Sequence, residues 1–184
     1  MWSVNGSENP PAWRLYSGVD AEPLLSEVTL CLDKAGLEAV LIGNAAAALQ
    51  GAPVTTVDFD FMFRKTPRNM AKLKDVARQL KATILRPYYP VSDLYRMVRD
   101  ADSLQVDFMS TIHGVRSFAG LRDRSTIVVF GGAPLRVAAL SDIIASKRAA
   151  RRPRDLAVID ILEAARGPKA SQPARPARRT QTRK

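Results

Sequence analysis

Three aspartates of this sequence lie inside apolar segments, where carboxylates are uncommon. Asp58 and Asp60 alternate with hydrophobic residues in VDFDFMF (57–63), and Asp107 has the same setting in LQVDFMS (104–110). A buried carboxylate is costly unless a cation balances its charge. Because residues two apart on a strand point to the same side, Asp58 and Asp60 are expected to project together. Such a pair can share a hard cation such as Mg²⁺.

The third acid extends this pattern only if its strand lies beside the first. In that case three carboxylates meet on one face of a sheet, where they can hold two Mg²⁺ ions and activate a hydroxyl for attack on the α-phosphorus of a nucleotide. The alternative for Asp58 and Asp60 is an edge strand whose two aspartates face water. Aspartate is disfavoured in strands, which weakens this alternative.

A glycine and a run of small residues precede the acidic pair in LIGNAAAALQGAPVTTVDFDFMF (41–63). Gly43 and Asn44 end a predicted strand and open a short alanine-rich helix. A glycine at this point lets the backbone approach a phosphate, and the start of a helix offers unpaired N–H groups. The sequence therefore predicts a phosphate-binding turn just before the two candidate metal ligands.

Hydrophobic periodicity predicts the elements that must position these residues. Ser141 is expected to cap the helix after it, and Leu156, Ile159 and Leu162 are expected to align on the last helix. The order of elements predicts a mixed α/β (α+β) fold, with a mixed central sheet flanked by helices and two C-terminal helices. The predicted helices span 21–36, 44–51, 66–80, 142–152 and 154–165, and the predicted strands 37–43, 57–63, 82–86, 93–100 and 103–111, the last two as a hairpin. The segment 125–137 is expected to contain another strand, a Gly-Gly turn and a short extended piece.

Cysteine and histidine are too scarce for several classes of site. With Cys31 and His113 as the single residues of their types, the chain forms no internal disulfide and no common Cys/His zinc site. The first 20 residues lack the pattern of a signal peptide, and no apolar run reaches the roughly 18 residues of a membrane-spanning helix. A cytoplasmic protein is therefore expected, with His113 in a loop.

Basic charge is concentrated at the C-terminus. From Arg166 to Lys184 there are seven lysines or arginines and no acid, which leaves 21 of the 28 basic residues against 18 acids in the preceding 165 residues. The Pro-, Ala- and Arg-rich tail cannot bury enough apolar surface to order itself. It is interpreted as a solvated terminus, with an electrostatic arm for RNA or another polyanion as the alternative.

These features predict the domain organisation: an irregular segment over 1–20, one folded domain over 21–165 and a basic disordered tail over 166–184.

A second basic run extends from Lys147 to Arg154. It is either a solvated helix end, where cations suit the helix dipole, or a contact for nucleotide or RNA. The residue pattern does not choose between these interpretations.

The segment 41–63 resembles the active-site region of the minimal nucleotidyltransferase superfamily, which has the polymerase-beta-like fold. It looks closest to the abortive-infection nucleotidyltransferase toxins. That branch has a Gly-Gly or Gly-Ser turn, a small-residue helix, a Gly-x-Pro/Arg-x-Thr loop and an Asp-x-Asp strand. Here Gly43-Asn44, the alanine run, Gly51 to Thr56 and Asp58-Phe59-Asp60 correspond. The segment LRVAALSDIIASKRAARRPRDLAVIDIL (135–162) is also similar, so the resemblance covers about 22–165.

The resemblance implies a role for each matching residue. Asp58 and Asp60 match the metal-binding acids. Asp107 matches the third acid, a ligand of the catalytic metal and a candidate general base. The implied cofactor is Mg²⁺, and the implied substrate is a nucleoside triphosphate (NTP).

The remaining matches concern the nucleotide. Gly43 matches the glycine that approaches phosphate, and Lys147 matches the lysine that meets the triphosphate. Asp155 matches the acid that anchors the last helix near the site. The predicted nucleotide contacts are therefore Gly43, Asn44, Thr56 and Lys147. Arg154 and Asp155 are expected to support these contacts without touching the nucleotide themselves.

The implied activity is Mg²⁺-dependent transfer of a nucleoside monophosphate from an NTP to a hydroxyl of an RNA (tRNA) or a protein. By family analogy the protein is a toxin of a toxin-antitoxin system, with an antitoxin as partner and no membrane partner. The alternative is a catalytically inactive relative that binds nucleotide, nucleic acid or a partner protein. Asn44 favours this alternative, because many active members carry serine or glycine there, whereas the intact acid triad argues for activity.

Overall fold

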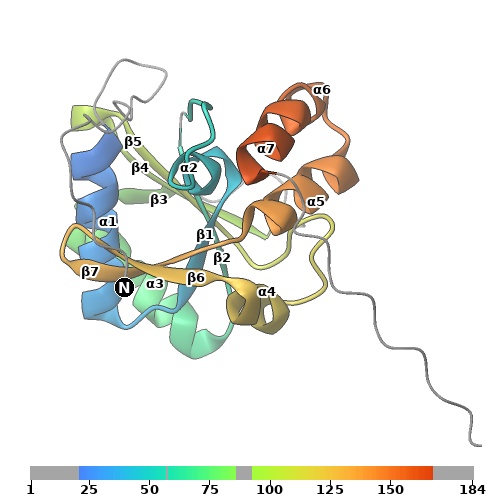
Figure 1. Ribbon diagram of the computed structural model, residues 1–184. Helices are drawn as coiled ribbons and strands as arrows, with labels where there is room; N and C mark the ends of the chain where they lie inside the picture. Colours follow the sequence, from blue (N-terminus) through green and yellow to red (C-terminus); the bar gives the residue numbers. More distant parts are fainter. Residues whose placement is uncertain (1–20, 57, 86–92, 168–184) are drawn as a thin grey trace, which may run out of the picture.

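A seven-stranded mixed sheet forms the centre of the protein (Figure 1). The computed structural model describes residues 21–56, 58–85 and 93–167. The strands follow one another across the sheet in the order β3-β4-β5-β2-β1-β7-β6. Their bounds are β1 Ala39–Ile42, β2 Phe59–Phe63, β3 Thr83–Leu85, β4 Leu94–Arg99, β5 Leu104–Met109, β6 Thr126–Phe130 and β7 Ala133–Val137.

The strand pairing explains how segments far apart in sequence meet. β1 runs antiparallel to β2 and parallel to β7, and β2 runs parallel to β5. The predicted hairpin of β4 and β5 is present, with the short 3-10 turn Asp100–Asp102 between its strands. The mixed sheet is therefore confirmed, and the central pair β2 and β5 comes from two separate parts of the chain.

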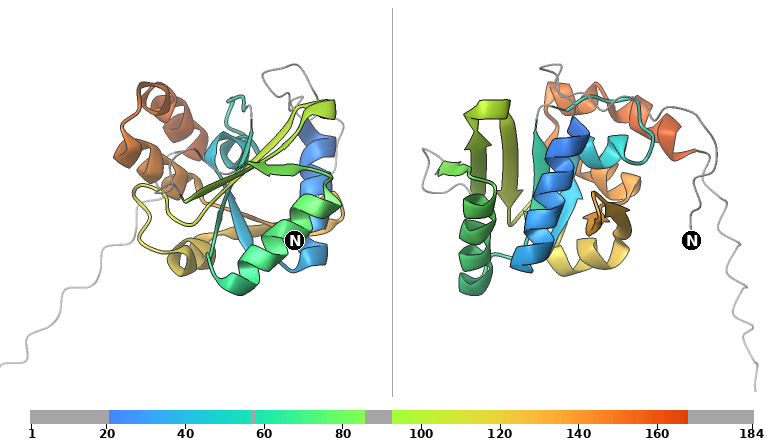
Figure 2. Two further views of the ribbon diagram at one scale, coloured as in Figure 1. Left: turned by 180° about the vertical axis from the view of Figure 1, so that it is seen from behind. Right: turned by 90° about the vertical axis from the view of Figure 1, so that its left-hand side faces the viewer.

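Helices cover both faces of this sheet (Figures 1 and 2). α1 and α3 lie on one face, whereas α5 and α7 lie on the other. The short α2 follows β1 and contacts both β1 and β2. The helix bounds are α1 Ala21–Ala35, α2 Gly43–Ala48, α3 Pro67–Gln79, α4 Phe118–Arg124, α5 Leu140–Ala150, α6 Pro153–Leu156 and α7 Ile159–Arg166.

Alternation along β2 separates a hydrophobic face from a polar one. Phe59, Phe61 and Phe63 are fully buried, and the ring of Phe61 stacks on that of Phe108 at a centroid distance of 5.3 Å. The ring of Phe63 meets Tyr95 of β4 edge-on at 6.1 Å. Burial of these aromatic rings fixes which face of β2 is internal. The alternate residues of β2 are thereby held on the opposite face.

Several local predictions are corrected by the structure. Ser141 does not cap α5, because the helix already begins at Leu140 and its N-cap residue is Ala139. The last predicted helix is divided into α6 and α7, and Leu156 is 48% exposed while Ile159 and Leu162 are buried. The break between the two helices takes Leu156 out of the apolar stripe. α4 was not predicted, although Ser117 caps it by accepting a hydrogen bond from the Gly120 amide at 3.1 Å.

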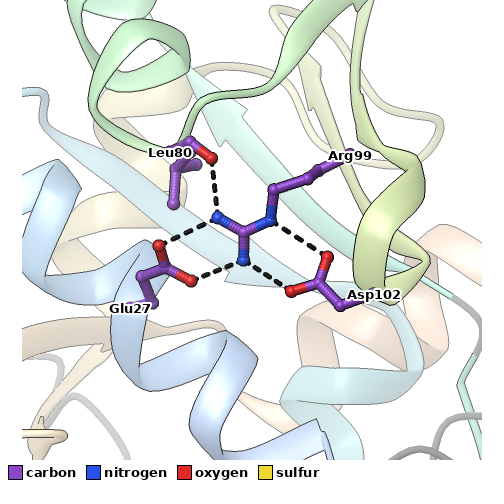
Figure 3. Close-up of polar contacts among 4 residues, drawn as sticks. All are labelled: Glu27, Leu80, Arg99 and Asp102. Carbon is purple, nitrogen blue, oxygen red and sulfur yellow. Dashed lines mark hydrogen bonds and ion pairs between the residues drawn. The ribbon is translucent and has the colours of Figure 1, made fainter.

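Arg99 connects α1 and α3 to strand β4 on the face of the sheet that these two helices cover (Figure 3). Arg99 of β4 donates hydrogen bonds to both carboxylate oxygens of Glu27 on α1 and of Asp102, at 2.6–3.0 Å. It also donates to the carbonyl of Leu80, just after α3, at 2.6 Å. These five bonds join α1, α3 and β4, and we call Arg99, Glu27, Asp102 and Leu80 the Arg99 cluster.

Two predictions lie wholly or mostly outside the described residues. These are the irregular segment over 1–20 and the basic tail, of which only Arg166 and Gly167 are described. Among the helices that the structure describes, none has both the length and the apolar character needed to cross a membrane.

Candidate active site

The three aspartates predicted from the sequence lie together on the polar face of β2 and β5. Asp60 and Asp107 are register partners on these adjacent parallel strands, and Asp58 immediately precedes β2. One carboxylate oxygen from each residue lies within 4.8 Å of the others. The prediction that Asp107 lies on a strand beside Asp58 and Asp60 is confirmed. We call these three residues the acid cluster.

Neighbouring side chains contact two members of the acid cluster. Arg96 of β4 lies opposite Asp107 and donates from Nε and Nη2 to its two carboxylate oxygens, at 2.8 and 2.6 Å. The amide of Gln105 donates to Asp58 at 2.9 Å. Arg96 and Gln105 therefore belong to the site, although the sequence pattern predicted neither of them.

The pKa values of two aspartates show how unfavourable the cluster is without a cation. Burial raises the pKa of Asp60 from 3.8 to about 7, and the negative charges of Asp58 and Asp107 add to the effect. Burial also raises the pKa of Asp58, with Asp107 as the next cause. The positive charges of Lys147 and Arg154 oppose the rise in the pKa of Asp60. These shifts are the ones expected when carboxylates share a site with too little compensating charge.

The chemistry of the cluster fits a hard divalent cation. Its donors are carboxylate oxygens from three residues, the ligand type that Mg²⁺ prefers, and they converge closely enough for a metal ion to bridge them. The raised pKa values of Asp58 and Asp60 are also consistent with a site that gains from added positive charge. Mg²⁺ or Mn²⁺ could therefore bind here through Asp58, Asp60 and Asp107.

The turn after β1 approaches the acid cluster closely. Gly43 has φ +69°, and a Cβ atom at this position would clash with the Oδ2 atom of Asp60. Glycine is thus required both by the backbone conformation and by the space beside the carboxylate. Next to it, Asn44 donates from Nδ2 to the Thr55 carbonyl at 2.9 Å, while its buried Oδ1 has no hydrogen-bond partner among the described residues.

A pocket of about 740 Å³ opens over the acid cluster. It also contains Gly43, Asn44, Thr56, Lys147, Arg154 and Asp155, which are the other residues assigned to the site from the sequence. Lys147 donates to Asp155 at 3.1 Å, and both side chains are largely buried. Thr56 donates to the backbone carbonyl of Asp58 at 2.6 Å. The structure therefore brings all the predicted site residues to one cavity, whereas their roles stay predictions.

The basic run from Lys147 to Arg154, which extends from the end of α5 into α6, is divided between two surroundings. Arg148 forms an exposed ion pair with Glu163 at 2.5 Å, whereas Arg152 and Arg154 line the pocket. His113, in the loop after β5 as predicted, is exposed and lies at the pocket wall. Part of this basic run is thus available to an anionic ligand in the pocket.

Comparisons with known proteins identify the fold. No family model and no curated sequence matches the chain. Among solved structures, the lincomycin-bound lincosamide antibiotic adenylyltransferase LnuA matches with a TM-score of 0.58 and 10% identity, over 78% of this chain and 97% of that one. ANT(2")-Ia in complex with adenylyl-2"-tobramycin matches with a TM-score of 0.55 and 14% identity, over 80% and 95%. JHP933 from Helicobacter pylori matches with a TM-score of 0.52 and 19% identity, over 82% and 68%.

These likenesses show that the chain has the nucleotidyltransferase, polymerase-beta-like fold. The fold expected from the segment 41–63 is therefore confirmed. At such low identities the comparisons establish the fold alone. The assignment to the toxin branch stays a prediction.

Proposed function

We propose that the protein is a Mg²⁺-dependent nucleotidyltransferase that transfers a nucleoside monophosphate from an NTP to a hydroxyl group. The observation that carries this proposal is the convergence of Asp58, Asp60 and Asp107 within 4.8 Å at a pocket of a nucleotidyltransferase fold. An acid cluster alone is common on protein surfaces. Its place in this pocket, beside the Gly43 turn, is what supports catalysis.

Asp58, Asp60 and Asp107 would hold the metal ions, which supply charge neutralisation at the triphosphate and activation of the acceptor hydroxyl. In the reaction, the acceptor oxygen forms a bond to the α-phosphorus, and the bond between this phosphorus and the α–β bridging oxygen breaks. Pyrophosphate leaves, and the acceptor proton passes to a base, for which Asp107 is the candidate. Carboxylates fixed on two adjacent strands would keep these groups in a constant geometry.

The nucleotide would lie along the pocket wall formed by the turn after β1 and by α5. Because Gly43 lacks a Cβ atom, the turn after β1 lies directly against the carboxylate of Asp60, and Asn44 and Thr56 offer polar groups at the same wall. Lys147 would meet the β- and γ-phosphates and stabilise the charge that develops on the leaving group. Its ion pair with Asp155 would hold it in place, and Arg154 would add positive charge nearby.

For the acceptor, we propose a hydroxyl of an RNA, tRNA in particular, or of a protein. The support is the sequence resemblance to abortive-infection toxins, together with Arg152 and Arg154 at the pocket, which suit a polyanion. A toxin role beside an antitoxin follows from the same resemblance. A small molecule is the competing acceptor class, because the matching structure of LnuA is lincomycin-bound and that of ANT(2")-Ia is a complex with adenylyl-2"-tobramycin.

A second candidate function is nucleotide or partner binding without catalysis. Two observations favour it: Asn44 occupies the turn position where many active relatives have serine or glycine, and Arg96 engages both oxygens of Asp107. An inactive relative would still bind nucleotide in the pocket. It would not form a nucleotidyl product with any acceptor.

Incubation of the full chain with each labelled NTP, Mg²⁺ and an acceptor pool tests the proposal. The pools are total cellular RNA, cellular protein including the chain itself, and small hydroxyl compounds such as lincomycin and tobramycin. Label should enter RNA or protein with the wild type and with Asp33→Asn, an exposed aspartate of α1, but not with Asp60→Asn. Label in the small compounds alone would exclude the macromolecular acceptor, and NTP binding without any labelled product would establish the non-catalytic function.

A further inference from the structure

The ion pair between Arg96 and Asp107 has a position that the proposed chemistry does not explain. The guanidinium approaches from the antiparallel neighbour β4 and occupies both carboxylate oxygens, at 2.8 and 2.6 Å. The side chain of Asp107 is only 5% exposed, whereas that of Arg96 is 39% exposed. Arg96 therefore connects an almost fully buried metal-ligand candidate to the solvent-facing side of the pocket.

We propose that Arg96 is the resident counter-ion of the acid cluster and makes divalent-metal binding depend on the nucleotide. Arg96 balances the charge of Asp107 when no metal is bound, and it weakens the binding of a metal ion that arrives alone. This inference rests on the proposed function, because it assumes that Asp58, Asp60 and Asp107 are the metal ligands. Arg96 is therefore a positioning residue: it acts through Asp107 and favours a metal ion that binds with nucleotide over a metal ion alone.

A bound metal ion need not displace Arg96 from Asp107. Each carboxylate oxygen has two lone pairs, and each of the two N–H groups of Arg96 uses one of them. Asp107 can therefore bind a cation with its remaining lone pairs while the bidentate pair persists. Arg96 and the metal ion would then be close neighbours of the same sign.

Arg96 changes the electrostatic balance of the acid cluster. The ionised acid cluster alone has a charge of −3, and Arg96 reduces it to −2 before any metal ion arrives. A divalent ion entering without nucleotide is repelled by the guanidinium, which offsets the attraction of one of the three carboxylates. A triphosphate brings several negative charges of its own, which offset Arg96. The penalty from Arg96 should thus be large for the metal alone and small for the metal with nucleotide.

The same strand offers a matched control. Arg99 lies three residues from Arg96 but on the opposite face of the sheet, where it binds Glu27 and Asp102 (Figure 3). Arg99→Gln removes the same charge from the chain as Arg96→Gln and breaks a similar bidentate contact. It does so away from the acid cluster, so a general effect of charge or stability would appear in both variants.

The test measures Mn²⁺ affinity of the full chain at pH 8.5, by electron paramagnetic resonance of free Mn²⁺. Arg96→Gln should bind Mn²⁺ alone at least about tenfold more tightly than the wild type, because removing one charge near the ion strengthens its attraction to the carboxylates. Arg96→Lys, which keeps the charge, and Arg99→Gln should resemble the wild type. With a non-hydrolysable analogue of the NTP selected in the transfer assay, the difference between Arg96→Gln and the wild type should fall below about threefold.

Equal or weaker binding of Mn²⁺ alone by Arg96→Gln would overturn the counter-ion role and leave Arg96 as a structural partner of Asp107. If Arg96→Gln is unfolded without metal, millimolar Mn²⁺ should restore its circular-dichroism spectrum. The same Mn²⁺ should not restore the spectrum of an unfolded Arg99→Gln. Failure of Mn²⁺ to refold Arg96→Gln would equally overturn the inference. Absence of Mn²⁺ binding in all proteins, with and without nucleotide, would instead refute the proposed metal-dependent function itself.

Discussion

Carboxylates meet an arginine on both faces of β4, with opposite outcomes. In the Arg99 cluster, one guanidinium makes five hydrogen bonds to two carboxylates and a carbonyl, and it joins α1, α3 and β4. In the acid cluster, Arg96 makes two bonds to Asp107, while the pKa of both Asp58 and Asp60 is raised. The satisfied cluster stabilises the fold, whereas the acid cluster has too little compensating positive charge and would gain from an added cation.

The pKa values of individual aspartates distinguish the two clusters. The pKa of Asp102 is lowered by its hydrogen bond with Arg99, so its charged form is favoured in the folded protein. The pKa of Asp60 is raised to about 7, so its charged form is disfavoured until positive charge arrives. Shifts of this kind in a pocket indicate a functional site more often than a structural one.

The largest effect is expected when the acid cluster loses a ligand. Asp58→Asn, Asp60→Asn or Asp107→Asn should lower nucleotidyl transfer by at least about a thousandfold, because the metal ions carry most of the transition-state stabilisation. Single-turnover transfer assays with saturating Mg²⁺ measure this effect. Transfer by Asp60→Asn at wild-type rate would show that the cluster is not the catalytic centre.

Breaking the Arg99 cluster should affect stability instead. Arg99→Gln leaves Glu27 and Asp102 without their shared cation, and we expect a loss of about 2–3 kcal/mol in the free energy of unfolding, below the cost of breaking a fully buried pair. Urea denaturation measures the loss. Mg²⁺-dependent NTP binding should persist in the folded variant, and a loss of this binding without a loss of stability would reverse the contrast between the two clusters.

Neutralising Asp60 should stabilise the metal-free protein in a pH-dependent manner. The folded-state pKa of about 7 exceeds the ordinary value of 3.8, so the folded wild type binds more protons than the unfolded chain between these values, and its stability falls as pH rises from about 4 to about 7. Asp60→Asn should lack this fall. Its gain should be near zero at pH 4 and about 1–2 kcal/mol at pH 8, after a reduction for water at the open pocket.

Chemical denaturation at pH 4, 6 and 8, with a chelator present, follows this effect. Asp33→Asn, on the exposed side of α1, is the matched control and should show no such trend. A stability gain of Asp60→Asn that is the same at all three pH values would contradict the electrostatic origin of the raised pKa.

The smallest effect is expected for an ion pair outside both clusters. The Nη2 atom of Arg148 lies 2.5 Å from the Oε1 atom of Glu163, and the two side chains are 57% and 40% exposed. Because exposed pairs are screened by water, Arg148→Gln should change the free energy of unfolding by less than about 0.5 kcal/mol. A loss as large as that of Arg99→Gln would mean that burial does not explain the difference between the clusters.

The sequence was sufficient to predict which acidic side chains lie together on the polar face of the sheet. Alternation in 57–63 correctly predicted that Asp58 and Asp60 share a side, and the matching setting of Asp107 correctly predicted its neighbouring strand. The sequence also indicates the buried face of this strand, because Phe59, Phe61 and Phe63 follow the two-residue period of a half-buried strand.

What the sequence could not provide was cross-strand register. Arg96 faces Asp107 only because the hairpin of β4 and β5 turns at Asp100–Asp102, which fixes the pairing of Arg99 with Leu104 and so of Arg96 with Asp107. A shift of one residue would move Arg96 to the other face. α4 was missed for a different reason: it has only seven residues, too few for a helical period to stand out.

The most direct test of the central claim uses one NTP labelled at either the α- or the γ-phosphate. We expect α-label to become covalently attached to an RNA or protein acceptor in Mg²⁺ and γ-label to be released as pyrophosphate. Excess chelator or Asp60→Asn should abolish the transfer. Transfer of γ-label to the acceptor, or transfer of α-label that persists in chelator, would contradict a metal-dependent nucleotidyltransferase site at Asp58, Asp60 and Asp107.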